Sequence, residues 1–203
     1  MVMRMRKFLL VSVLMALMSG HEAMAGGTPA KVLIVYYSAR GHTRAMAEAV
    51  ARGANTVSGV SVQLLPVEKA TNRDVLAADA IILGTPVYNA NVAPPIQKFI
   101  NHWPFRGAPL RNKIGAAFVT AGGISAGEEL TQVNLLHSML IFGMIIVGGP
   151  HWQAPFGASG VTEEEPFKSA KGEKLVQPHF LQKGEALGQR VAEIVRRFKR
   201  AGR

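Results

Sequence analysis

The sequence predicts a doubly wound α/β fold, in which helices cover both faces of a mostly parallel sheet. Five apolar runs alternate along the chain with segments of helical periodicity, which is the pattern of repeated strand–helix units. Most of these runs are apolar at consecutive rather than alternate positions, as expected for strands buried on both faces. The five runs are residues 31–37, 60–65, 79–84, 114–120 and 144–147.

The first two strands are joined by a predicted helix. Lys31 to Tyr37 is rich in Val, Ile and Tyr, and the short polar loop 38–43 follows it. After this loop, apolar residues recur at helical spacing in RAMAEAVARGA. The second strand, 60–65, follows a glycine-containing turn, and residues 66–74 form a short connection with a predicted helical turn.

The third strand leads into a loop that we expect over residues 85–95. Its last two residues, Pro94 and Pro95, suit the first turn of a helix. Residues 101–112 have no regular pattern and precede the fourth strand.

The fourth strand runs into a second loop rich in small residues, and a helix is predicted from about residue 128 to 142. The fifth strand, 144–147, precedes residues 148–178, a long Gly/Pro-rich stretch without a clear period. Such length without regular structure indicates a functional loop. A helix over residues 179–200 closes the chain.

The composition is that of a folded domain and excludes several kinds of site. With 48% hydrophobic residues, the chain can build a complete core. It has no cysteine, which excludes disulfides, zinc–thiolate sites, iron–sulfur clusters and cysteine nucleophiles, and no metal site is predicted. The formal charge of +10 gathers near the two chain ends without a recognition motif, so we expect no nucleic-acid partner.

Residues 1–25 have the pattern of a secretory signal peptide. A basic start precedes an apolar stretch at 8–18, and an Ala-x-Ala cleavage pattern ends at Ala25. The apolar stretch is short for a membrane span, so we do not expect an integral membrane protein. We predict one domain over 26–203 in a periplasmic or secreted protein. A chain started at Met24 would instead be a complete cytoplasmic domain, which is the alternative.

The loop 38–43 is a candidate phosphate site. Backbone N–H groups and a helix N-terminus converge in a loop of this kind. Ser38 and Thr43 add hydroxyls, and Arg40 and His42 add charge. The spacing matches neither a dinucleotide-binding fingerprint nor a P-loop. The alternative is an ordinary turn whose Ser or Thr caps the helix.

Two more loops follow the third and fourth predicted strands. The carboxyl ends of parallel strands lie at one edge of the sheet, so these loops should lie beside the loop 38–43. Doubly wound sheets bind their ligands at this edge. Residues 85–93 offer Tyr88 as an aromatic wall and two asparagine amides, and residues 120–127 offer glycines that let backbone approach a flat ring. Alone, Tyr88 is more typical of a packing aromatic and the glycines of a flexible turn. Together, a phosphate site, a ring wall and amide donors predict flavin mononucleotide (FMN).

The chain resembles the flavodoxin-like flavoproteins, and most closely the WrbA-type NAD(P)H:quinone oxidoreductases and NAD(P)H-dependent FMN reductases. The matching segments are VLIVYYSARGHTRAMAEAVARGA, DAIILGTPVYNANVAPPIQKFI, IGAAFVTAGGISAGEE, GMIIVGGPHW and FGASGV. This resemblance implies a flavodoxin-like three-layer α/β/α sandwich with a five-stranded parallel sheet. It implies an FMN site at Ser38, Ala39, Arg40, Gly41, His42, Thr43, Val87, Tyr88, Asn89, Thr120, Ala121, Gly122, Gly123, Ile124 and Ser125.

The chain departs from the WrbA-type pattern in several places. Ala39 or Arg40 stands where the family has an aromatic, and Phe142 replaces a His that lies by the flavin and the acceptor. Trp103 or Phe105 corresponds loosely to a tryptophan of the acceptor pocket. A long insertion after the second strand, linked to tetramer assembly in the family, is absent. We therefore expect a homo-oligomer smaller than a tetramer, with a dimer favoured.

The resemblance implies an FMN-dependent enzyme that takes electrons from NAD(P)H and reduces a quinone-like small molecule by two electrons. The flavin carries this chemistry, so no catalytic side chain is assigned. His42 and His151 are candidate proton donors, although a lone His is more often structural. The alternative is a non-catalytic FMN-binding or electron-transfer flavoprotein in the periplasm. A serine hydrolase is disfavoured because no G-x-S-x-G motif is present.

Overall fold

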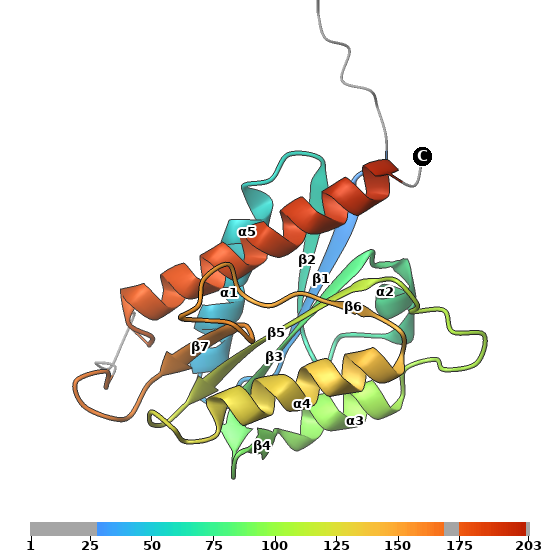
Figure 1. Ribbon diagram of the computed structural model, residues 1–203. Coiled ribbons are helices and arrows are strands. Elements are labelled where there is room, and N and C mark those ends of the chain that lie inside the picture. The colour runs from blue at the N-terminus through green and yellow to red at the C-terminus, as the bar shows by residue number, and fades with distance from the viewer. Residues whose placement is uncertain (1–27, 169–174, 202–203) are drawn as a thin grey trace, which may run out of the picture.

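The parallel sheet is the centre of the structure, a computed structural model that describes residues 28–168 and 175–201 (Figure 1). The strand order is β2-β1-β3-β5-β6. The predicted signal peptide lies outside the described residues. The strands along this path are β2 (Val60–Pro66), β1 (Ala30–Tyr36), β3 (Ala80–Tyr88), β5 (Ile114–Ala121) and β6 (Ile145–Ile146).

Helices cover both faces of the sheet, as predicted for a three-layer sandwich. One face packs against α1 (His42–Asn55) and α5 (Pro178–Ala201), in a core that joins Ile34 and Phe118 to helix residues such as Met46. The other face packs against α2 (Asn72–Ala77), α3 (Pro94–Asn101) and α4 (Glu128–Ile141). Parallel strands need this cover because both of their faces are apolar. The flavodoxin-like fold prediction is confirmed.

Local signals in the sequence explain where the helices begin. At α2, the Thr71 side chain accepts a hydrogen bond from the Asp74 N–H while the Asp74 carboxylate accepts from the Thr71 N–H, a reciprocal capping box. At α3, Pro94 and Pro95 occupy the first turn, where their lack of an N–H costs nothing. The predicted role of these prolines is therefore confirmed.

The third strand is longer than predicted. β3 continues through Thr85 to Tyr88, and a tight turn returns the chain as the antiparallel strand β4 (Asn91–Val92). The turn residues Asn89 and Ala90 both have positive φ, 50° and 59°, as a two-residue hairpin turn requires. The expectation of a loop over residues 85–95 was therefore wrong for most of its length.

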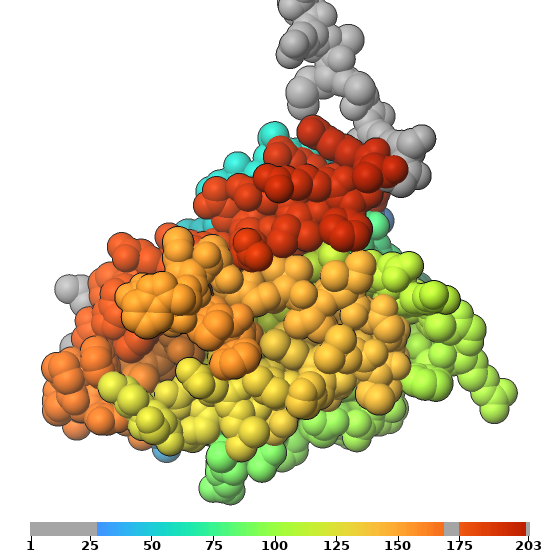
Figure 2. Space-filling model, viewed as in Figure 1, coloured from blue at the N-terminus to red at the C-terminus, as the bar shows by residue number. Residues whose placement is uncertain are grey.

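The fifth position of the sheet is filled by two short strands. β6 pairs with the start of β5, and β7 (Ala158–Val161) pairs with its end, both in parallel. Residues 147–157 leave the sheet between them and form part of the surface between α4 and α5 (Figure 2). The predicted strand at 144–147 is thus confirmed only in its centre. The expectation that residues 148–178 lack regular structure was wrong at β7.

Helices α1 and α5 pack with their backbones in close contact. A Cβ atom built on Gly188 of α5 would lie 1.9 Å from the Val50 carbonyl oxygen of α1. A Cβ atom on Gly53 of α1 would lie 1.8 Å from the Glu185 carbonyl oxygen of α5. No side chain fits at either place, so these two glycines set the distance between the helices.

We expect Gly188→Ala to lower the free energy of unfolding by about 1–3 kcal/mol, because the methyl group meets backbone that cannot yield. Gly184→Ala in the same helix is the matched control, since the only contact of a Cβ there below 3.4 Å would be with the side-chain sulfur of Met46, at 2.7 Å. Both substitutions gain about 1 kcal/mol of helix propensity. Urea unfolding of both variants measures the difference; equal stabilities would contradict the close contact.

Candidate functional site

The three predicted loops meet at one edge of the sheet. They lie at the carboxyl ends of β1, β3 and β5, which are neighbours in the strand order, and the second and third of them include the last residues of β3 and β5. The order reverses between β1 and β3, because β2 lies on one side of β1 and β3 on the other. The chain after β1 enters α1 on one face, and the chain after β3 enters α3 on the opposite face. A doubly wound sheet binds its ligand in the crevice formed at such a point.

The first loop wraps its backbone around the Ser38 side chain. The Ser38 hydroxyl oxygen accepts hydrogen bonds from the N–H groups of Gly41 and Arg44, both at 3.1 Å. Gly41, at the N-cap of α1, has a φ of 91°, a conformation that glycine adopts without strain. Ser38 thus organises the start of the helix. The N–H groups of His42 and Thr43 lie in the first turn of α1, where backbone N–H groups have no hydrogen-bond partner within the helix.

Thr43 faces the core rather than the crevice. Its hydroxyl lies 2.7 Å from the Thr120 hydroxyl, and both side chains are buried. This bond joins the start of α1 to the end of β5. Thr120 and Ala121 are both buried residues of β5, so these two predicted site residues contribute to the crevice chiefly through their backbone.

Arg40 extends away from the loop and forms an ion pair with Glu163. The Arg40 Nη1 atom lies 2.9 Å from Glu163 Oε1, and 77% of the Arg40 side chain is exposed. His42 lies in the same electrostatic environment. Burial lowers its pKa from the ordinary value, with a raising contribution from Glu163 and a further lowering contribution from Arg40. His42 is therefore biased toward the neutral imidazole.

The β3–β4 hairpin brings an aromatic pair to the edge. Tyr88 is 40% exposed, and its ring meets the Tyr37 ring edge-on, with 6.4 Å between the centroids. An exposed ring on a rigid hairpin suits a stacking partner better than a packing residue. Val87 lies beside it in the strand, and Asn89 lies in the turn. The amide of Asn91 instead donates to the Asn89 carbonyl within the turn.

The third loop, between β5 and α4, is held in place next to the start of α4. Glu128 in the first turn of α4 accepts a hydrogen bond from the Ser125 N–H at 2.9 Å. Gly127 is in close contact with the hairpin, since a Cβ atom there would lie 2.5 Å from the Ala90 Cβ. The second and third loops are therefore in direct contact at this edge of the sheet.

Residues after β7 enter the crevice and were missed by the sequence reasoning. The Glu164 carboxylate accepts a hydrogen bond from the Ile124 N–H at 2.6 Å, and Gly122 and Gly123 lie alongside Glu163 and Glu164. The sequence does contain a signal for them, since the acidic residues 163–165 follow the small-residue segment 157–160. This signal could not be used because β7 was not predicted. Tyr37 was also missed, because it ends an apolar run that reads as buried strand.

The donor groups of the crevice suit an oxygen-rich anion. Ile124 N–H and the Arg40 guanidinium already hold carboxylate oxygens of the same chain. The start of α1 adds N–H groups and the positive end of a helix dipole. The exposed Tyr88 ring lies at the same edge of the sheet, beside Tyr37. This set fits the phosphate, flat ring and carbonyl oxygens of FMN.

The aromatic residues that differ from the WrbA-type pattern lie elsewhere. Phe142 packs edge-on against Trp103 and Phe105, with ring centroids 5.3 and 5.7 Å apart. This cluster lies past the end of α4, where the Asn112 N–H donates to the Gly143 carbonyl just before β5 begins. Because α4 begins at the crevice and spans about 20 Å, Phe142 lies at the opposite edge of the sheet. Within one chain, none of the three aromatics reaches the loops.

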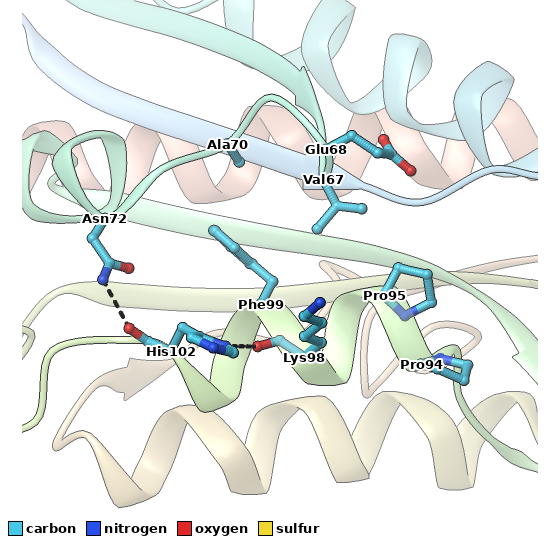
Figure 3. A pocket seen from close by; sticks show the side chains of 9 residues that line it. All are labelled: Val67, Glu68, Ala70, Asn72, Pro94, Pro95, Lys98, Phe99 and His102. Carbon is cyan, nitrogen blue, oxygen red and sulfur yellow. Dashed lines mark hydrogen bonds between the residues drawn. The ribbon is translucent and has the colours of Figure 1, made fainter.

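A groove of about 760 Å³ lies outside the crevice, on the face covered by α2 and α3 (Figure 3). Phe99 and Lys98 extend from α3 toward the connection that carries Val67 and Ala70. The groove lies beside α2, which has only six residues. None of the predicted cofactor residues lines it. No helix in the described part of the chain is long and apolar enough to cross a membrane.

Comparison with known proteins places the chain among flavoproteins. A family model described as NADPH-dependent FMN reductase matches residues 66–159. An NAD(P)H dehydrogenase (quinone) of Azorhizobium caulinodans is 37% identical, over 73% of this chain and 87% of the relative. A flavodoxin of Aquifex aeolicus is 31% identical, over 83% and 88%.

Solved structures show the same architecture. The WrbA-like flavodoxin of Agrobacterium tumefaciens superposes with a TM-score of 0.67 at 24% identity, over 83% of this chain and 98% of that one. An archaeal flavodoxin superposes with a TM-score of 0.63 at 25% identity, over 82% and 99%. The fold is thus shared across nearly the whole length of these proteins.

We expect Thr43→Val to lower the free energy of unfolding by about 1–3 kcal/mol, because it leaves the buried Thr120 hydroxyl without its partner. The double variant Thr43→Val/Thr120→Val removes both hydroxyls together. It should cost clearly less than the sum of the two single variants. Urea unfolding of the four proteins completes the cycle, and strictly additive losses would contradict a bond between the two hydroxyls.

We expect acid to destabilise the protein partly through His42. The pKa of His42 is lower in the folded protein than the ordinary value of 6.5. Below pH 6.5 the unfolded chain therefore binds a proton at His42 more readily than the folded protein does. The stability contributed by the neutral ring is therefore present above that pH and is lost below it. The urea midpoint of His42→Asn should change less between about pH 7.5 and 5.5 than that of the wild type. His137→Asn, at an exposed position of α4, is the control, and its urea midpoints should follow those of the wild type.

Proposed function

Because the chain belongs to the flavodoxin-like flavoproteins, the family of the NAD(P)H dehydrogenases (quinone) and the FMN reductases, we propose that it reduces quinones or similar small acceptors. It is an FMN-dependent oxidoreductase, with NAD(P)H as the electron donor. The relatives named as quinone dehydrogenases support the choice of acceptor. The quinone itself, and the choice between NADH and NADPH, are parts of the proposal.

One observation carries the proposal: three segments from neighbouring strands bring a helix N-terminus, an exposed aromatic ring and a glycine-containing loop to one edge of the sheet. Residues 38–43 would hold the phosphate with the helix start that Ser38 organises. Tyr88 would bound the flavin ring. The third loop would offer backbone N–H groups to it, of which that of Ile124 is held by Glu164 in this structure. When bound, FMN supplies the two-electron chemistry, and the protein supplies its position and surroundings.

The alternative is an electron-transfer flavoprotein without quinone reductase activity. The lack of a catalytic side chain favours this alternative: among the described residues of the crevice, none is placed as a general acid or base. The charge of the chain weighs against it. Electron carriers of this fold dock through acidic surfaces on basic partners, whereas this chain has a formal charge of +10.

Export is a separate part of the proposal and rests on the pattern of residues 1–25. A periplasmic enzyme would lack the cytoplasmic pool of reduced nicotinamide, so its donor there would be a redox protein or a quinol. N-terminal sequencing of the protein purified from cell fractions tests export. A mature chain beginning at Gly26 in the periplasmic fraction would support it, and an intact Met1 in the cytoplasm would refute it.

The function is tested with purified residues 26–203, titrated with FMN and then mixed with NADPH and a quinone. We expect the flavin absorption bands to shift on binding, to bleach with NADPH and to return when the quinone is added. Bound flavin that NADPH leaves oxidised would favour the electron-transfer alternative. No binding at micromolar FMN would refute the proposal.

We expect Ser38→Ala to weaken FMN binding about tenfold, since the N–H groups of Gly41 and Arg44 lose the acceptor that orders the loop. Ser61→Ala, at an exposed position of β2, is the matched control and should bind as the wild type does. Quenching of flavin fluorescence measures both dissociation constants. Equal affinities in the two variants would show that the phosphate does not use this loop.

A further inference from the structure

The segment 162–164, directly after β7, is fastened along the third loop of the crevice. Both the N–H and the hydroxyl of Thr162 donate to the Ala121 carbonyl, at 3.0 and 3.2 Å. The N–H groups of Glu163 and Glu164 both donate to the Gly122 carbonyl at 2.9 Å. The backbone of this segment therefore has a fixed position beside the donors of the cofactor site.

The Glu164 side chain occupies one of those donors. Its Oε2 atom accepts the Ile124 N–H at 2.6 Å. The same oxygen lies 2.7 Å from the point where a Cβ atom on Gly123 would be. The carboxylate thus fills the space next to a backbone N–H that the third loop would otherwise present to a ligand.

The Glu163 side chain reaches the first loop. It holds Arg40, the cation of the phosphate loop, at 2.9 Å, with both side chains more than half exposed. A guanidinium held by a carboxylate offers less positive charge to a second anion. The segment 162–164 therefore contacts the first loop through the Glu163 carboxylate and the third loop through the Glu164 carboxylate.

We propose that the segment 162–164 is an acidic strap across the cofactor site, in which Glu164 competes with the flavin for the Ile124 N–H and Glu163 competes with the phosphate for Arg40. FMN binds fully only when both carboxylates release these donors. The strap thereby sets the affinity for the cofactor. This inference rests on the proposed function in one respect, that FMN is the cofactor of the crevice.

Two electrostatic effects determine whether loss of a carboxylate tightens or weakens FMN binding. The phosphate of FMN carries close to two negative charges at neutral pH, so a carboxylate beside its loop repels it. A hydrogen bond from an N–H to a carboxylate is stronger than one to a neutral carbonyl, so the flavin ring alone does not displace Glu164 easily. Removal of either carboxylate should therefore tighten FMN binding, whereas removal of an ordinary contact residue weakens it.

The test compares Glu164→Ala and Glu163→Ala with Glu165→Ala. Glu165 is exposed in the same segment, and among the described residues its side chain has no hydrogen bond to either loop. All three variants lose the same charge. Dissociation constants for FMN, and for riboflavin as the analogue without phosphate, are measured by fluorescence quenching, and the melting temperature of each apoprotein is recorded.

We expect Glu164→Ala to bind both FMN and riboflavin about tenfold more tightly than Glu165→Ala. Glu163→Ala should bind FMN about two- to fivefold more tightly and riboflavin unchanged, because its exposed ion pair affects only the phosphate. The melting temperatures of the Glu164 and Glu163 apoproteins should fall slightly, as contacts are lost. Opposite changes in cofactor affinity and apoprotein stability distinguish competition from a structural role.

The strap is refuted if Glu164→Ala binds FMN no more tightly than Glu165→Ala, or more weakly. Tight binding in all variants without NADPH turnover would refute the proposed reductase function and leave the strap to be judged by the affinities alone. Absence of FMN binding in every variant, Glu164→Ala included, would overturn both.

Discussion

The contact between the backbones of α1 and α5 is the constraint on which the crevice depends. Gly53 and Gly188 allow the two helices to approach until neither could carry a side chain at the crossing. The first loop of the site opens directly into α1, and Leu175, just before α5, lies against Gly41 in that loop. A change in helix spacing would therefore move the phosphate loop relative to the rest of the crevice. The rigidity of the site is supplied by the layer of helices behind it.

Most of the fold could be predicted because its signals are local and repeated. Buried parallel strands are apolar over several consecutive residues, and the five runs gave the order of the elements. The three loops of the site could be predicted for the same reason, since carboxyl ends of parallel strands share one edge. The prolines of α3 and the acidic residue that begins α4 were also recognisable, because helix starts have a local chemistry.

The parts that could not be predicted depend on contacts between distant segments. β3 extends past Gly84 because Thr85 and Pro86 pair with Val119 and Thr120 of β5, although Pro86 alone reads as a turn. β7 consists of small residues and is a strand only because β5 lies beside it. Without β7, nothing in the sequence placed Glu163 and Glu164 next to Arg40 and Ile124. The position of Glu163 and Glu164 is thus set by tertiary contacts, and no local sequence pattern predicts it.

The divided fifth strand has a consequence for how this protein meets other chains. A sheet edge with a long row of unpaired N–H and carbonyl groups is a template for the strand of another molecule. Here one edge is broken, since β6 has two residues, β7 has four, and the chain leaves the sheet between them. The other edge, β2, alternates partly buried and exposed residues and ends in Pro66, which has no N–H to donate. The divided border therefore offers no long template for strand addition, so an assembly of this protein is not expected to continue its sheet on that side.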